Sequence, residues 1–266
     1  MFVTVRAGIR LLLFFILSLT TVVLVGAGNL LLRIFSAGWA VSWKNCIIGL
    51  WARLMCTILN MDIQLEGDPP APPFFLVSNH LSYIDVIPLW LLTKGTFIAK
   101  IEVSTWPFFG WATRILGVIF IDRNMRRDVQ RVNKLIASSV SDRQGVMIFP
   151  EGTSTNGTDV KVFHSSLLQY PAEEYMPVSY VTLSYRSGNA ERPASQHICW
   201  WGDMPFFGHF WELLKLPGFE VSVTFGEKTV RERDRKELAD RLRERIKEDF
   251  VPVATATGRP KQPELS

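Results

Sequence analysis

Cysteine is scarce in this sequence of 266 residues, and its three copies form no pattern that binds zinc or builds a disulfide framework. Cys46, Cys56 and Cys199 are an odd number, without a Cys-x-x-Cys pair and without a histidine at ligand spacing. A zinc site and a disulfide scaffold are therefore not indicated. Three buried, reduced thiols in a protein whose catalytic part faces the cytosol fit this pattern.

Other patterns are absent as well. No Gly-x-Ser-x-Gly segment occurs, so the activated serine of the α/β-hydrolase elbow is missing. No segment repeats at a fixed period, which argues against a repeat architecture. The formal net charge is only +4, which is too small to indicate a nucleic-acid partner.

Apolar and aromatic residues are plentiful by contrast. Hydrophobic residues make up 48% of the chain, enough to fill a sizeable core, and they include 18 Phe and 9 Trp. Aromatic side chains gather where an apolar body meets a wet edge. Membrane lipids are therefore the favoured partner.

A long apolar run occupies residues 11–32, where the polar residues are only Ser18, Thr20, Thr21 and Asn29. About 20 apolar residues suffice to cross the hydrocarbon core of a bilayer, so we predict a transmembrane or deeply inserted helix. A cleaved signal peptide is the competing interpretation, because residues 25–27 are small. The length of the run and the apolar segment that follows favour the membrane helix.

The segment 36–60 repeats apolar residues, several of them Trp, at helical spacing. It is either an interfacial amphipathic helix or the second arm of a helical hairpin, and the sequence does not decide between them. We expect the protein in the cytoplasmic membrane with its catalytic domain on the cytoplasmic side. Cations flank the first helix on both sides, so charge alone does not fix this topology.

A proline-rich segment, residues 68–73, interrupts the helical pattern, and we place the domain boundary near it. The expected parts are a membrane anchor in residues 1–60, a catalytic domain in residues 61–250 and a disordered tail in residues 251–266. Short apolar runs then alternate with helical patterns, which predicts an α/β fold with a mixed sheet flanked by helices. The predicted strands are 74–78, 96–100, 118–122, 145–149, 176–184 and 219–226, and the predicted helices are 84–92, 129–142 and 230–250.

A histidine and an aspartate, His80 and Asp85, lie five residues apart where a predicted strand passes into a helical turn. A carboxylate that accepts the Nδ1 proton fixes the imidazole tautomer and leaves Nε2 free to take a proton from an attacking hydroxyl. This is the base and the orienting group of a triad whose nucleophile is a substrate hydroxyl. We therefore take His80 and Asp85 as the candidate catalytic residues.

Two further segments carry candidate binding groups. Phe149-Pro-Glu-Gly-Thr153 places a carboxylate and a conformationally permissive glycine directly after a buried strand. A second strand, 118–122, is followed by Arg123, whose guanidinium matches phosphate in a bidentate way. A strand-ending turn with a solvated glutamate is the plainer alternative for the first segment, and Arg126 and Arg127, which follow the second, are expected to form a solvated edge.

Together these residues resemble the glycerolipid (PlsC-like) acyltransferase family, which includes 1-acylglycerol-3-phosphate acyltransferase. Its blocks appear in order here as Asn79 to Asp85, Gly117 to Arg123, Phe149 to Thr153 and Met176 to Ser179. The resemblance implies an O-acyltransferase of phospholipid biosynthesis that uses acyl-CoA or acyl-carrier protein as donor, with no metal, no cofactor and no covalent enzyme intermediate. It also implies that Arg123, Glu151, Gly152 and Thr153 bind the acceptor.

The acceptor is left open by one departure from the family pattern. Members that make phosphatidic acid carry an Arg directly after Glu-Gly-Thr, where this chain has Ser154, and a later Lys is His164 here. We expect 1-acylglycerol-3-phosphate as the first candidate acceptor. A lysophospholipid with a masked phosphate, or an amino-acid lysolipid such as lyso-ornithine lipid, is the alternative.

Two other classes of function are weighed against acyl transfer. A lipid-binding protein that has lost the chemistry has no need to keep His80, Asp85 and Glu151 together. A hydrolase needs a nucleophile that the sequence does not offer. The aromatic run in residues 199–211 is an interfacial patch, a wall of an acyl groove or ordinary core.

Overall fold

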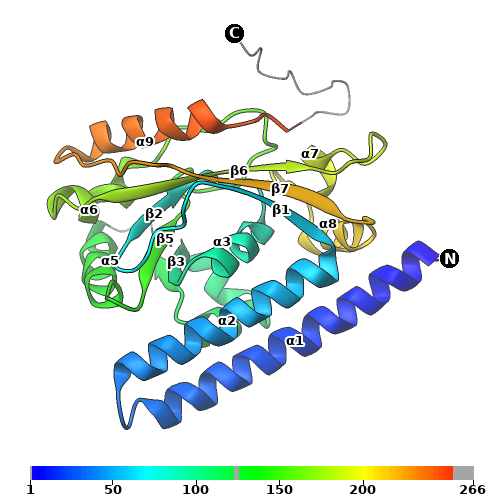
Figure 1. Cartoon of the computed structure of the whole chain (residues 1–266), viewed down its shortest axis with the longest axis horizontal. Helices are drawn as coiled ribbons and strands as arrows, with labels where there is room; N and C mark the ends of the chain where they lie inside the picture. Colours follow the sequence, from blue (N-terminus) through cyan, green and yellow to red (C-terminus); the bar gives the residue numbers. More distant parts are fainter. Residues whose placement is uncertain (1, 123–125, 254–266) are drawn as a thin grey trace.

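The computed structural model describes residues 2–122 and 126–253, which form a mixed sheet with helices on both faces (Figure 1). Within this described part, the sheet has the strand order β1-β7-β6-β2-β5-β3-β4. Every neighbouring pair is parallel except β6 and β7, which are antiparallel. The predicted mixed α/β fold is thus confirmed. The strands are β1 (Met61–Glu66), β2 (Phe75–Ser78), β3 (Gly95–Lys100), β4 (Ile119–Ile121), β5 (Gly145–Ile148), β6 (Val178–Arg186) and β7 (Phe219–Phe225).

The central strands are buried because helices cover both faces of the sheet. All residues of β2 and β5 are buried, as continuous apolar runs in a parallel sheet require. One core lies between the sheet and the side that carries α1 (Phe2–Leu32), α2 (Ala37–Leu59) and α3 (Val86–Leu92). The other lies under α5 (Arg126–Ser139) and α9 (Arg235–Asp249), and Figure 1 shows α9 on the face opposite α1 and α2.

The remaining helices are short. They are α4 (Phe109–Ile115), α6 (Gln169–Glu173), α7 (Ala194–His197) and α8 (Phe206–Leu214), with 3-10 turns η1 (Tyr83–Asp85), η2 (Ile101–Thr105) and η3 (Ser165–Leu168). Helices α7 and α8 fall in and beside the aromatic run 199–211, which carries no clear period of its own.

Strand β1 is absent from the sequence-based expectations. It lies at the edge of the sheet and is mostly exposed, so its residues lack the apolar run that marks a buried strand. The sheet therefore begins at residue 61, and the proline-rich segment 68–73 is a connection between β1 and β2.

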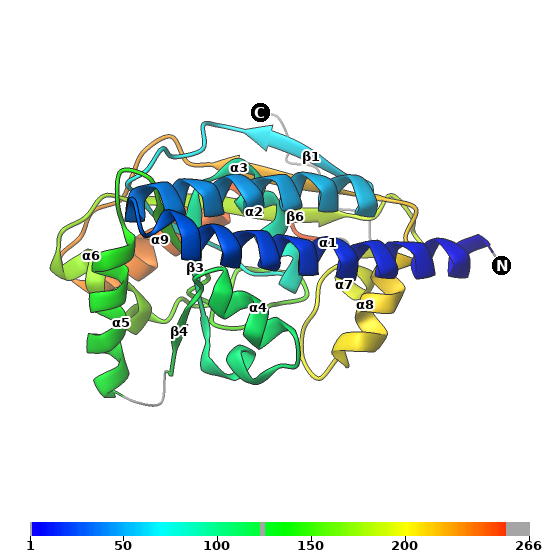
Figure 2. The same cartoon turned by 90° about the horizontal axis from the view of Figure 1, so that it is seen from below.

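The first two helices form a hairpin that lies along the α/β part of the chain (Figure 2). The indole of Trp43 donates to the main-chain oxygen of Leu24 at 2.9 Å, and that of Trp51 donates to the Ser18 hydroxyl at 3.1 Å. Of the two arrangements that the sequence allowed for segment 36–60, the hairpin is the one observed. Cys46 is exposed on this hairpin, which corrects the expectation of three buried thiols.

Helix α1 combines an apolar surface with a polar anchor. It is long and apolar enough to cross a membrane, and most of its most hydrophobic stretch is exposed. The buried guanidinium of Arg10 donates to the main-chain oxygens of Leu214, the last residue of α8, and of Leu216, just beyond it. A cation at helix-terminal carbonyls is well placed, so α1 is tied to the domain by a specific contact.

Candidate active site

The loop that follows β2 carries the candidate base, and Asn79 fixes where this loop starts. Its side-chain amide donates to the main-chain oxygen of Leu183 at 2.9 Å and accepts from the Leu183 N–H at 2.7 Å. Both bonds mimic a further step of the pairing between β2 and β6. The next residue, His80, therefore emerges at the carboxyl end of β2 in a fixed direction.

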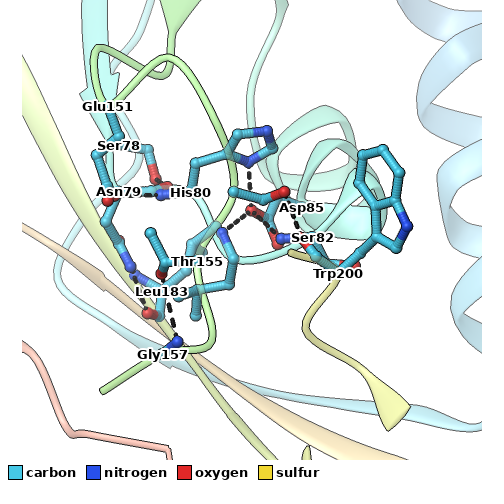
Figure 3. A network of polar contacts seen from close by, with 12 residues as sticks. Ser78, Asn79, His80, Ser82, Asp85, Glu151, Thr155, Gly157, Leu183 and Trp200 are labelled. Carbon is cyan, nitrogen blue, oxygen red and sulfur yellow. Dashed lines mark hydrogen bonds and ion pairs between the residues drawn. The ribbon is translucent and has the colours of Figure 1, made fainter. Parts of the chain in front are cut away.

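The carboxylate of Asp85 holds the His80 ring and the loop together (Figure 3). Oδ2 lies 2.8 Å from His80 Nδ1 and accepts from the main-chain N–H groups of Leu81 at 2.7 Å and Ser82 at 3.0 Å. Asp85 is 0% exposed. The predicted pair of residues is thus brought into contact, with Nδ1 assigned as the protonated nitrogen because its partner is a carboxylate.

The other oxygen of Asp85 has a partner that sequence reasoning did not find. The buried hydroxyl of Tyr185, on β6, donates to Oδ1 at 2.9 Å. Burial, reinforced by the Asp85 charge, raises the pKa of Tyr185 well above 10, so the hydroxyl keeps its proton. No local signal marks Tyr185, because the pairing of β2 with β6 is what places it beside Asp85.

The His80 ring is also fixed by stacking. It lies on Phe149 with the ring centroids 4.1 Å apart and the planes at 14°, and Phe149 lies in turn on Phe97 at 5.5 Å. One face of the imidazole is therefore covered by an aromatic ring. The side chain of His80 keeps an exposed fraction of 21%, which leaves a path to substrate.

Glu151 braces the main chain of His80 rather than its ring. One carboxylate oxygen accepts from the His80 N–H at 2.7 Å, and the other accepts from the Lys161 N–H at 2.9 Å. Burial raises the pKa of Glu151 to about 7, although both hydrogen bonds oppose the shift. The Thr155 N–H adds a bond to the main-chain oxygen of His80 at 3.0 Å, so the loops after β2 and β5 are joined.

Three further predicted binding residues remain to be placed. Gly152 has a φ of +74°, which glycine adopts without strain, and with it the chain turns back beside His80. Thr153 is exposed, and both residues line the cavity described below. Arg123 lies outside the described residues, so its predicted contact with the acceptor is not placed.

An apolar cavity of about 500 Å³ opens beside His80. Its walls come from α1, α2, α3, η2 and α4, and from the aromatic segment between α7 and α8. Among the described lining residues, Lys100 is the one lysine or arginine and Glu102 the one acidic residue. In residues 2–122 and 126–253 no group of three or more His, Cys, Asp or Glu side chains is arranged to hold a metal. The site thus places the His80 side chain in the wall of a space that suits hydrocarbon.

Comparison with known proteins identifies the family to which the chain belongs. The family model described as Acyltransferase matches residues 62–185. The chain is 30% identical over 208 residues to lyso-ornithine lipid O-acyltransferase of Pseudomonas aeruginosa. The aligned region covers 78% of this chain and 79% of that protein. The chain belongs to the PlsC-like acyltransferase family.

A further relative has another acceptor in its name. This chain is 27% identical to 1-acyl-sn-glycerol-3-phosphate acyltransferase of Neisseria gonorrhoeae, over 81% of this chain and 85% of that protein. Its fold is similar to the crystal structure of PlsC, the 1-acyl-sn-glycerophosphate acyltransferase of Thermotoga maritima. The TM-score is 0.64 at 20% identity, with 95% of this chain and 100% of the other covered. The enzyme is therefore a lysolipid O-acyltransferase, with an acyl donor and a lipid acceptor as substrates.

Proposed function

We propose that this acyltransferase uses His80 as the general base and Asp85 as the residue that orients it. The acceptor hydroxyl attacks the thioester carbonyl of acyl-CoA or acyl-carrier protein while Nε2 of His80 takes its proton. The tetrahedral intermediate then collapses, the C–S bond breaks as the new ester forms, and the sulfur takes the proton back from His80 and leaves as the free thiol. The contact of 2.8 Å between His80 Nδ1 and Asp85 Oδ2 is the observation that supports this proposal most strongly.

The surroundings of the pair support the same roles. Asp85 accepts four hydrogen bonds, so it stabilises an imidazolium without having to move. Phe149 covers one face of the ring, and the apolar cavity beside it accepts an acyl chain. We assign Gly152 and Thr153 to the acceptor end of that cavity, and Arg123 remains a proposed headgroup ligand.

For the acceptor, we now place lyso-ornithine lipid ahead of 1-acylglycerol-3-phosphate, which reverses the order that the sequence suggested. Ser154 carries no charge, and its buried hydroxyl already donates to the main-chain oxygen of Trp200. It therefore offers a phosphate neither a charge nor a free hydroxyl proton. The scarcity of cations among the described lining residues has the same implication. A dianionic headgroup that is left without cations is costly to desolvate.

We also propose that α1 and α2 hold the enzyme on the cytoplasmic membrane, with the catalytic domain on the cytoplasmic side. The apolar, largely exposed surface of α1 supports the membrane contact. The supply of acyl-CoA or acyl-carrier protein, which are cytosolic donors, supports the choice of side.

The test is acyl transfer from labelled acyl-CoA to each lysolipid, with the purified full-length enzyme in one detergent. We expect a labelled diacyl product from the wild type and a loss of at least about 100-fold in His80→Ala. His197→Gln is the matched control, because within the described residues the side chain of that histidine bonds the main-chain oxygen of Pro193, the residue that precedes α7, and lies outside the cavity lining. Release of free fatty acid alone indicates a hydrolase, and no turnover with any lysolipid indicates a lipid-binding protein; either result contradicts the proposal.

A further inference from the structure

The main chain of Trp200 is held between the two loops that build the candidate active site. Its N–H donates to the main-chain oxygen of Leu81 at 2.9 Å, and Leu81 directly follows the base. Its carbonyl oxygen accepts from the hydroxyl of Ser154, which is 4% exposed and follows Thr153. The position of this peptide therefore depends on both loops.

The indole of Trp200 forms part of the cavity wall beside His80. Both residues line the cavity, and in Figure 3 their rings project toward the same side of the view. The ring makes T-shaped contacts with Tyr83, at 5.9 Å between centroids, and with Trp106, at 6.1 Å. These neighbours fix its orientation.

The indole N–H is not available to a substrate. It donates to the main-chain oxygen of Met204 at 2.9 Å, within the same segment. What Trp200 presents to the cavity is therefore aromatic surface. The face of an indole is electron-rich, so it attracts an ammonium group and disfavours a phosphate.

We propose that Trp200 selects the acceptor headgroup and that Ser154 is its positioning residue, so that the site prefers a lysolipid with an ammonium group over a phosphomonoester. This inference rests on the proposed lysolipid acyltransferase function. It assigns position 154 a role other than supplying or lacking a charge, because its hydroxyl holds the main chain of the residue that meets the headgroup. Ser154→Arg removes the hydroxyl that bonds the Trp200 carbonyl and adds a positive charge. The substitution therefore alters both the position of Trp200 in the cavity wall and the charge of that wall.

The experiment measures kcat/KM for lyso-ornithine lipid and for 1-acylglycerol-3-phosphate, at one salt concentration and in one detergent. It follows the ratio of the first value to the second. We expect the wild type to prefer the amino-acid lysolipid. Trp200→Leu should lower the ratio about tenfold, in line with one cation–π contact in a desolvated site. Ser154→Ala should lower this ratio about threefold. Ser154→Thr, which keeps a hydroxyl, should have the ratio of the wild type. Ser154→Arg should lower it most, because a cation is added as well.

Two controls separate the specificity role from general damage. Ser184→Ala removes another buried hydroxyl, whose partner is the main chain of Val251, away from the cavity, and should leave the ratio unchanged. Trp200→Phe keeps an aromatic face and should retain most of the preference. If Trp200→Leu does not fold, Trp200→Met takes its place as the variant without an aromatic face and should lower the ratio to the same extent.

The outcomes distinguish this inference from the proposed function. If the wild type acylates neither lysolipid above the His80→Ala background, the proposed function fails. If it acylates both and the ratio is the same in the wild type, in Trp200→Leu and in Ser154→Ala, only the selection by Trp200 is wrong. A wild type that strongly prefers 1-acylglycerol-3-phosphate overturns the inference in the same way.

Discussion

The Glu151 carboxylate accepts a hydrogen bond of 2.7 Å from the main-chain N–H of His80, so a residue of one loop fixes the backbone of the proposed base in another. Glu151 is 2% exposed, and burial raises its pKa from 4.5 to about 7. Below pH 4.5 the carboxyl is protonated in both the folded and the unfolded chain. Between pH 4.5 and 7 the unfolded chain releases this proton first, so the contribution of Glu151 to stability falls as the pH rises.

We therefore predict a pH-dependent difference between the wild type and Glu151→Gln. The free energy of unfolding of the wild type minus that of the variant should decrease by on the order of 3 kcal/mol between pH 4.5 and pH 8, because Gln does not ionise. Denaturant unfolding in micelles, followed by tryptophan fluorescence, measures it. Glu191→Gln, at an exposed position, is the control and should show no such trend. A constant difference for Glu151→Gln would mean that this carboxyl has an ordinary pKa.

Asp85→Asn should lower turnover by about 10⁴ while the fold is kept, as in triads that lose the orienting carboxylate. An amide does not hold the imidazole in the required tautomer or stabilise the imidazolium. The measurement is kcat with a saturating lysolipid, together with a circular dichroism spectrum. Asp159→Asn changes a largely exposed carboxylate and should be active, whereas full activity of Asp85→Asn removes that residue from the mechanism.

Tyr185→Phe should lower kcat about tenfold with little change in KM, because Asp85 Oδ1 loses its hydrogen-bond donor. The residue acts through Asp85 and does not touch substrate, so binding should be spared. Steady-state kinetics at several pH values provides the measurement. Tyr180→Phe, on the same strand, is the matched control. Equal losses in both variants would indicate a general effect of removing a tyrosine hydroxyl from β6.

The enzyme should stay in the membrane pellet after washing with alkaline carbonate, because α1 exposes a long apolar surface. The amount of protein in pellet and supernatant after ultracentrifugation decides this. A protein known to be peripheral in the same membranes is the control and should be released. Complete release of this enzyme would remove the membrane anchor from the proposal.

The sequence by itself determined the features that depend on residues close together in the chain. His80 and Asp85 are five residues apart, so one tight turn suffices to join them, and their contact was predictable from spacing. Buried strands such as β2 and β5 are continuous apolar runs, and the long apolar helix is apparent from composition. The edge strand β1 was missed because exposure leaves it without such a run.

Only the tertiary structure decided which residues surround the proposed catalytic pair, His80 and Asp85. Tyr185 meets Asp85 because β6 pairs with β2, and Glu151 meets the His80 main chain because β5 pairs with β2 on its other side. The bond from Ser154 to Trp200 joins segments 46 residues apart. Such contacts depend on the order of strands in the sheet, and strand order is set by packing of the whole core, which no local pattern of residues encodes.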